Sequence, residues 1–221
     1  MRISTDMGWL DPLRVEHAEP LFELIHNSRS HLYPWLPWLK RIHSPQDTEA
    51  FIRQLCTERG PQFVIMVDDR VCGGVGFYHL EKAERKATVG YWLGAEYVGQ
   101  GIMTDAVRHL CHYGFEHLDL KRVEIRCASQ NMSSRKIPER LGFFYEGVQP
   151  KAEWLTDRYV DHAIYSILKE EFSLAFAQDS EPAPISPREE RALVPGERPA
   201  EAPGASKSDK DHWPEWPRLN W

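Results

Sequence analysis

Residues 90–115 read GYWLGAEYVGQGIMTDAVRHLCHYGF and decide the fold. β-Branched and aromatic residues over 87–93 predict a strand, which breaks at Gly94. The chain then turns through Gly99-Gln100-Gly101, and from Thr104 onward apolar residues recur every three or four positions, which predicts a helix. A strand, a glycine-bearing loop and a helix N-terminus in this order predict an anion site. The first helical amides lack internal partners there, and the helix dipole attracts negative charge.

The loop fits neither of two common phosphate-binding motifs. A Walker loop needs Lys and then Ser or Thr after its last glycine, where this chain has Ile102 and Met103. A dinucleotide fingerprint needs a third glycine at the position of Thr104. Because the loop holds no cationic side chain, the backbone amides of residues 99–104 would bind the anion. The alternative is a plain strand-to-helix turn that binds nothing.

The composition limits the classes of function. The chain has 221 residues, enough to bury a sizeable core, and its net charge of −6 argues against a nucleic-acid surface, which needs a basic face. We find no apolar run of about 18 residues and no apolar N-terminal segment, so we expect neither a membrane span nor a signal peptide. The cysteines are scattered without a C-x-x-C pair and predict buried thiols in a reducing cytoplasm: Cys56, Cys72, Cys111 and Cys127.

The remaining patterns predict an α+β domain with a mixed, mostly antiparallel seven-stranded sheet flanked by about four helices. The predicted strands are residues 13–15, 62–67, 71–79, 87–93, 123–127, 144–148 and 159–168. The predicted helices are residues 19–27, 45–58, 104–118 and 133–141. Within the 71–79 strand, Gly73, Gly74 and Gly76 predict a bulge or the close approach of a neighbouring backbone.

The composition changes after about Gln178, which divides the chain into a domain of residues 1–177 and a tail of residues 178–221. Eight of the 16 prolines lie in the last 44 residues, which predicts an extended or disordered Pro-rich tail. The tail ends with three tryptophans, Trp213, Trp216 and Trp221. Because so much aromatic area favours burial, this end could dock on its own domain, a second subunit or another partner.

Several short motifs resemble those of the GNAT superfamily of acetyl-CoA-dependent N-acetyltransferases. They are the glycine loop, Asn131-x-x-Ser134 and the segment 140–143, which reads RLGF. The RimJ/RimL branch, which includes ribosomal-protein N-terminal acetyltransferases, is the nearer match. It shares the runs YPWLPW at 33–38, YWL at 91–93, GIMT at 101–104 and DH at 161–162. The resemblance covers residues 8–174 and implies the GNAT fold, with acetyl-CoA as co-substrate and no metal.

The resemblance also implies which residues contact acetyl-CoA. They are Trp92, Leu93, Val98, Gly99, Gln100, Gly101, Ile102, Met103, Thr104, Asn131, Ser134 and Phe143. Val98 and Met103 depart from the residues that the superfamily often carries at these positions. Val98 removes one side-chain contact to the pyrophosphate.

Acetyl transfer to an amine needs an oxyanion donor, a group that assists the leaving thiolate, and a base. The resemblance assigns these roles to the Leu93 backbone N–H, to Ser134 and to Glu153. The alternatives are ordinary sheet backbone for Leu93, a helix cap for Ser134 and an exposed loop carboxylate for Glu153. Trp35 and Trp38 are expected on the acceptor side, with core or dimer packing as the alternative.

Three histidines have positions that could suggest catalysis or metal binding, but we expect neither role for them. His162 is interpreted as structural because its neighbour Asp161 points to the opposite face of the strand. His109 and His112 have a spacing that could bind a metal, but without a third ligand they predict a solvated helix face.

The sequence therefore predicts a cytoplasmic N-acetyltransferase in which a primary amine attacks acetyl-CoA directly in a ternary complex. The amine would belong to a protein N-terminus or to a small molecule. A homodimer is possible, and neither nucleic acid nor a membrane is expected as a partner. The alternative is a non-catalytic acyl-CoA-binding or partner-binding module that uses its Trp-rich tail.

Overall fold

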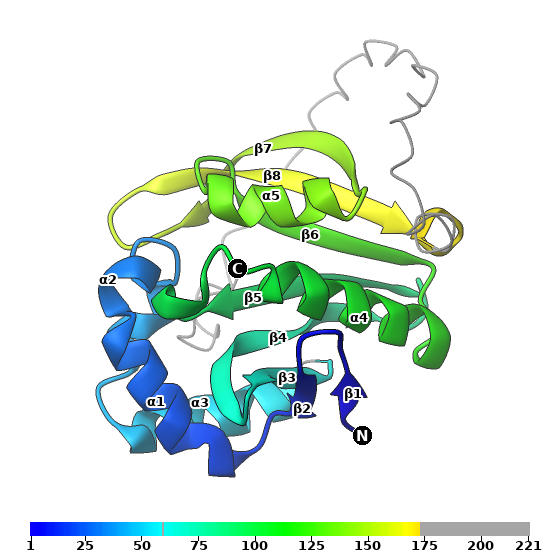
Figure 1. Cartoon of the computed structure of the whole chain (residues 1–221). Helices are drawn as coiled ribbons and strands as arrows, with labels where there is room; N and C mark the ends of the chain where they lie inside the picture. Colours follow the sequence, from blue (N-terminus) through cyan, green and yellow to red (C-terminus); the bar gives the residue numbers. More distant parts are fainter. Residues whose placement is uncertain (59, 173–221) are drawn as a thin grey trace, which may run out of the picture.

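The fold is an eight-stranded sheet with helices on both faces (Figure 1). The computed structural model describes residues 1–58 and 60–172, so the predicted tail lies outside the described residues. The strands are β1 Ile3–Ser4, β2 Trp9–Pro12, β3 Gln62–Val67, β4 Arg70–Glu81, β5 Lys86–Leu93, β6 Arg122–Ala128, β7 Phe144–Trp154 and β8 Tyr159–Leu168. The α-helices are α1 Ala18–Asn27, α2 Arg29–Leu32, α3 Pro45–Glu58, α4 Ile102–His117 and α5 Met132–Arg140. The 3-10 helices are η1 Val15–His17, η2 Pro37–Arg41 and η3 Ala95–Tyr97.

The strand order is β1-β2-β3-β4-β5-β6-β8-β7, and every adjacent pair is antiparallel except β5–β6. The predicted mixed, mostly antiparallel α+β architecture is therefore confirmed. None of the described helices is long and apolar enough to cross a membrane.

Two hydrophobic layers cover the sheet, and neighbouring residues of one strand face different layers. Phe77 packs into the cluster that contains the apolar side of α4, whereas Tyr78 packs into the cluster of α1 and α3. In the same way, Tyr91 packs against the α4 side and Trp92 against the α1–α3 side. This alternation is the two-residue period of a strand buried on both faces. Figure 1 shows α4 and α5 together along one face, with α1, α2 and α3 grouped apart from them.

The prediction of a first strand at residues 13–15 is wrong. The chain there enters η1, and the strand lies earlier, at β2, paired with the two-residue strand β1. Leu10 in β2 is fully buried, whereas Asp11 beside it is held by Arg2 and Arg14 at 3.1 and 2.7 Å. An acidic residue in the middle of β2 hides the apolar alternation of this strand. Because β1 and β2 take the place of the one strand predicted at residues 13–15, the sheet has eight strands rather than seven.

Strands β5 and β6 diverge, and this divergence opens a gap in the sheet. Their parallel pairing runs from Lys86 opposite Arg122 to Val89 opposite Ile125. In the part of the chain that the structure describes, residues 90–93 pair with β4 alone, while the end of β6 pairs with β8. A gap therefore opens between the end of β5 and the end of β6.

Glycines in β4 make room for the large side chain of Trp92 near the end of β5. A Cβ atom on Gly74 would lie 2.7 Å from the indole nitrogen of Trp92, and one on Gly73 would lie 2.2 Å from the Trp92 carbonyl oxygen. The predicted close approach of a neighbouring strand at these glycines is confirmed. The indole of Trp92 occupies space that any other residue at position 74 would fill.

The end of β5 is fastened to the helical layer at Gly94. A Cβ on Gly94 would lie 2.4 Å from Leu24 Cδ1 of α1, so the strand end and the helix are in direct contact. Ser28, which is 3% exposed, accepts a hydrogen bond from the Ala95 N–H at 3.0 Å. The segment that begins at Ser28 therefore has a defined position relative to Leu93.

We expect Gly94→Ala to lower the free energy of unfolding by about 1–3 kcal/mol, because the new methyl group overpacks against Leu24. Chemical denaturation measures this change. In a double-mutant cycle, the cost of Gly94→Ala should shrink when Leu24→Ala has removed the opposing methyl groups. If Gly94→Ala lowered the free energy of unfolding equally in both backgrounds, its effect would not come from a clash with Leu24.

Candidate functional site

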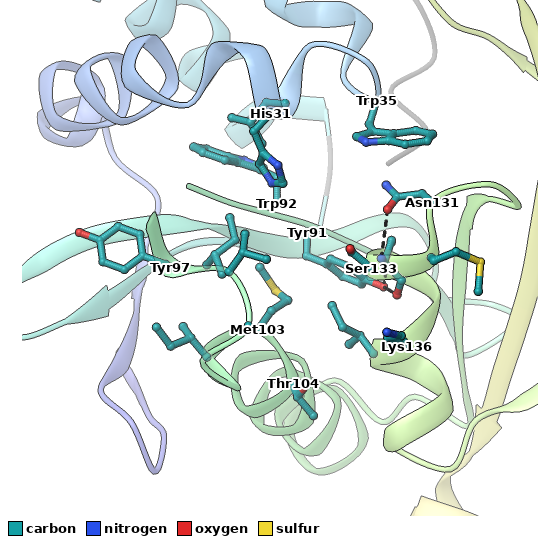
Figure 2. Close-up of a pocket in the computed structure, with 18 of the residues that line it drawn as sticks. His31, Trp35, Tyr91, Trp92, Tyr97, Met103, Thr104, Asn131, Ser133 and Lys136 are labelled. Carbon is teal, nitrogen blue, oxygen red and sulfur yellow. Dashed lines mark hydrogen bonds between the residues drawn. The ribbon is translucent and has the colours of Figure 1, made fainter. Parts of the chain in front are cut away.

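A cavity of about 570 Å³ occupies the gap beyond the end of β5 (Figure 2). Its walls come from α2 and the aromatic segment after it, from the end of β5, from the glycine loop with the start of α4, and from α5. The lining residues are His31, Leu32, Trp35, Leu36, Tyr91, Trp92, Leu93, Tyr97, Val98, Gly99, Gly101, Ile102, Met103, Thr104, Gln130, Asn131, Met132, Ser133, Ser134, Lys136, Ile137 and Arg140.

The loop places unshared amides on this cavity. Gly99 and Gly101 have φ values of +83° and +87°, the left-handed region that favours glycine. Gly101 is the N-cap of α4, and no side chain caps this helix end. The amides of Ile102, Met103 and Thr104 consequently have no partner within the helix. Together with the helix dipole, these amides favour negative charge at this end of the cavity.

Ten of the twelve predicted cofactor contacts line the cavity, and Gln100 and Phe143 do not. The Gln100 side chain donates to the Glu96 carbonyl oxygen at 2.7 Å, so it braces the loop from outside. Phe143 is 6% exposed and packs in the core that includes α4. Phe143 therefore supports the helices that form the cavity wall.

Ser134 lies at the centre of a small hydrogen-bond network. The sequence placed it at the start of the helix, but Asn131 is the N-cap, and its Oδ1 accepts the Ser134 N–H at 3.1 Å. Ser134 Oγ donates to Tyr91 Oη at 3.2 Å, and Tyr91 donates to the Ser134 carbonyl oxygen at 2.9 Å. Burial raises the pKa of Tyr91 well above its usual value, so the phenol stays protonated. The network links β5 to α5 across the gap.

The backbone of Leu93 points into the gap. Gly94 donates its N–H to the Cys72 carbonyl oxygen of β4 at 2.8 Å. Because backbone groups of successive strand residues point in opposite directions, the Leu93 N–H points away from β4. It faces the side on which β6 has diverged.

The structure separates the two tryptophans predicted for the acceptor side. Trp35 lines the cavity and also packs on Ala128, Leu155 and Val160. Trp38 is 2% exposed and stacks on Phe51 with a ring separation of 4.5 Å. It does not line the cavity, because η2 turns it into the core of the helical layer.

Glu153 lies within β7, not between the last two strands as predicted. The pairing of β7 with β8 is irregular between Gln149 and Glu153, and this irregularity accompanies a carboxylate that is only 8% exposed. Its Oε2 is 3.1 Å from Nε2 of the buried His162. The pair flanks the cluster on which Trp35 packs, and Glu153 is not part of the cavity lining.

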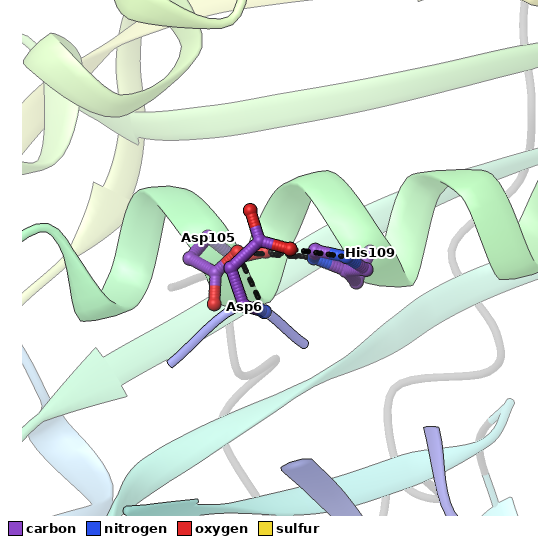
Figure 3. A group of neighbouring side chains, drawn as sticks. All are labelled: Asp6, Asp105 and His109. Carbon is purple, nitrogen blue, oxygen red and sulfur yellow. Dashed lines mark hydrogen bonds and ion pairs between the residues drawn. The ribbon is translucent and has the colours of Figure 1, made fainter. Parts of the chain in front are cut away.

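A second polar cluster joins the N-terminal turn to α4 (Figure 3). Asp105 accepts the Met7 N–H at 3.0 Å, and His109 Nδ1 is 3.1 Å from its carboxylate. Burial alone would raise the pKa of Asp105, but hydrogen bonds, led by one from Arg108, lower it. Arg108 also bonds to Asp6, so its guanidinium forms ion pairs with the carboxylates of both Asp6 and Asp105. The prediction of a solvated helix face is confirmed for the exposed His112 and wrong for His109, whose ring is partly buried against Asp105.

Sequence reasoning missed several residues of the cavity wall. Lys136 and Arg140 lie four residues apart on α5 with Ser133 and Ile137, and this helical spacing could have identified them as one face. They supply the cations that the glycine loop lacks. No local signal identifies His31, because it reaches the cavity only through the packing of α2 against the end of β5.

We expect Cys127 to resist alkylation in the folded protein. Burial raises its pKa to about 11, although a bond from Ser134 partly offsets this, and the residue is 2% exposed. Its thiolate fraction at pH 8 is then about 10⁻³, rising roughly tenfold per pH unit. Peptide mapping after iodoacetamide treatment should show the exposed Cys56 modified first. Urea-unfolded protein is the control, and modification of Cys127 as fast as Cys56 at pH 8 would contradict this assignment.

The chain matches known proteins over most of its described length. Residues 9–144 match the family model described as an acetyltransferase (GNAT) domain. The chain is 35% identical over 165 residues to the putative ribosomal N-acetyltransferase YdaF of Bacillus subtilis (strain 168), covering 72% of this chain and 90% of that protein. It is 32% identical over 161 residues to the ribosomal-protein-serine acetyltransferase of Escherichia coli (strain K12), covering 71% and 90%.

A solved structure has a similar fold. The ribosomal-protein α-N-acetyltransferase RimL, in complex with coenzyme A, aligns with a TM-score of 0.72 at 25% identity. The alignment covers 76% of this chain and 98% of that chain. The similarity therefore extends over nearly the whole of that enzyme.

Proposed function

The chain belongs to the GNAT family of acetyl-CoA-dependent N-acetyltransferases, and from this premise we propose that it acetylates the N-terminal amine of a protein by direct attack in a ternary complex. The observation that carries the proposal is the cavity at the β5–β6 divergence. Anion-binding amides lie on one of its sides and an aromatic acceptor side on another. A thioester held by its diphosphate would reach the gap beyond Leu93.

The two ends of the cofactor site supply different interactions with the phosphates of acetyl-CoA. The loop amides at the start of α4 suit the diphosphate, because their hydrogen bonds and the helix dipole both favour negative charge. Lys136 and Arg140 reach the cavity from α5 and can neutralise further phosphate charge. Figure 2 shows Lys136 on the α5 side, across the cavity from the loop residue Tyr97.

The carbonyl of the thioester would lie between Leu93 and Ser134. The Leu93 N–H points into the gap and can stabilise the oxyanion of the tetrahedral intermediate. By turning away from Tyr91, to which it donates in this structure, the Ser134 hydroxyl can donate a hydrogen bond to the departing thiolate sulfur. The raised pKa of the nearby Cys127 thiol, about 11, favours direct attack over an acetyl-cysteine intermediate.

The acceptor side favours an amine that carries a single charge. Among the described residues, the cavity lining includes no Asp or Glu side chain. A polyamine brings several positive charges that would find no carboxylate there. A protein N-terminus brings one amine on an extended chain, which the aromatic wall of Trp35 and Trp92 can accept. The name of the similar enzyme RimL gives an α-N-protein acceptor, and that of the Escherichia coli relative gives a ribosomal-protein serine.

An acceptor screen tests the function. The full chain is incubated with acetyl-CoA and with ribosomal-protein N-terminal peptides, spermidine and small primary amines, and CoA release and acetyl mass shifts are measured. We expect turnover on peptides with a free N-terminus and none on peptides blocked there. Saturable CoA binding without release across the panel would favour a non-catalytic acyl-CoA-binding module.

We expect Gly101→Ala to weaken CoA binding, measured by titration calorimetry, by about fivefold or more. An alanine at φ +87° costs about 1–2 kcal/mol and can be relieved only by moving the loop amides. Gly142→Ala is the matched control, because its φ is +75°, nothing lies within 4 Å of its Cβ position, and it does not line the cavity. If both variants lost the same CoA affinity, the loop geometry would not explain the binding.

We expect Ser134→Ala to lower kcat by about 10–10³-fold, because the leaving sulfur loses its hydrogen-bond donor. CoA affinity should change little, since the phosphate contacts remain. Ser129→Ala serves as the control, because Ser129 lies in the β6–α5 connection just before this helix and does not line the cavity. An unchanged kcat for Ser134→Ala under conditions where chemistry limits the rate would remove Ser134 from the mechanism.

A further inference from the structure

His31 occupies a fixed position at the acceptor end of the cavity. It lies on α2 and lines the cavity with Trp35 and Trp92. Figure 2 shows its imidazole beside the Trp92 indole, directed into the cavity. The His31 N–H bonds to the Ser28 carbonyl oxygen at 3.0 Å, and the Ser28 hydroxyl accepts the Ala95 N–H at 3.0 Å. Two hydrogen bonds therefore connect the backbone of His31 to the strand end that carries Leu93.

Amine acetylation needs a group that accepts a proton near neutral pH, because an α-amino group with an ordinary pKa of about 7.7–8.0 is largely protonated there. Burial raises the pKa of Tyr91 and of Tyr97, so neither phenol is a base at this pH. Lys136 and Arg140 are cations and lie on the α5 wall. Among the described lining residues, His31 is the one histidine, and imidazole is the side chain that most often serves as a general base.

The carboxylate predicted as the base is not part of the cavity lining. Glu153 is 8% exposed, is bonded to His162, and flanks the cluster under Trp35. Its pairing with His162 fits a role in holding β7 against β8.

We propose that His31 is the catalytic base that takes the proton from the acceptor amine, an inference that rests on the acetyltransferase function proposed above. The ammonium group transfers one proton to an imidazole nitrogen, and the freed nitrogen lone pair forms the C–N bond with the thioester carbonyl carbon. The carbonyl electron pair moves to oxygen beside the Leu93 N–H. As C=O reforms, the C–S bond breaks, the nitrogen loses its second proton, and the sulfur gains one. The products are the amide and CoA thiol, and His31 returns its proton to solvent.

The test compares the full-length wild type with His31→Gln on the best peptide from the screen. We expect kcat to fall by about 10²–10⁴-fold while the dissociation constant for CoA stays unchanged. The deficit should shrink toward pH 9–10, because the amine there is deprotonated without help. His31→Ala should regain activity in proportion to added imidazole, since the side chain is exposed on an open cavity. His26→Gln, an exposed histidine of α1 outside the cavity lining, should behave as wild type.

Three results would overturn the proposal while the wild type remains active. The first is a kcat of His31→Gln equal to that of the wild type. The second is a loss of activity in the His31 variants that neither imidazole nor higher pH relieves. The third is a rise of activity with pH that is lost in Glu153→Gln but kept in His31→Gln. Thermal unfolding of each variant separates misfolding from lost chemistry. A wild-type chain that releases no CoA with any amine would instead overturn the acetyltransferase function and this role with it.

Discussion

The divergence of β5 from β6 is the constraint on which the rest of the structure depends. Parallel pairing ends at Val89 and Ile125, and beyond this point each strand has a partner on its outer side only. The backbone of residues 90–93 is thereby available on one side at the bottom of a cavity rather than used in a continuous ladder. The glycine loop that follows β5 and the helix that follows β6 then become the two facing walls.

The layers on the two faces of the sheet have separate tasks, and they meet at the end of β5. The α4–α5 layer holds the anion site and Ser134, whereas the α1–α3 layer carries His31 and Trp35. The end of β5 contacts the α1–α3 layer at Gly94, where the Leu24 side chain packs on the backbone, and at Ala95, whose N–H donates to the Ser28 hydroxyl. The position of His31 and Trp35 therefore depends on packing that does not involve the glycine loop.

The features that the sequence predicted well are those that depend on neighbouring residues. The strand, the loop and the α4 start follow from local periodicity and from two glycines that adopt positive φ values. The features it missed depend on tertiary packing. Nothing local distinguishes Trp35, which faces the cavity, from Trp38, which is turned into the core by η2. The burial of Glu153 similarly depends on an irregularity in β7 that only its pairing with β8 reveals.

The cluster around Asp105 gives the first residues of the chain a share in the anion site. The carboxylate of Asp105 receives the Met7 amide, and Met7 Sδ lies 3.9 Å from where a Cβ on Gly101 would be. A shortened chain beginning at β2 would leave the first turn of α4 without this clamp. The leading residues, which look like an overhang in the sequence, therefore support the glycine turn and the start of α4 from outside.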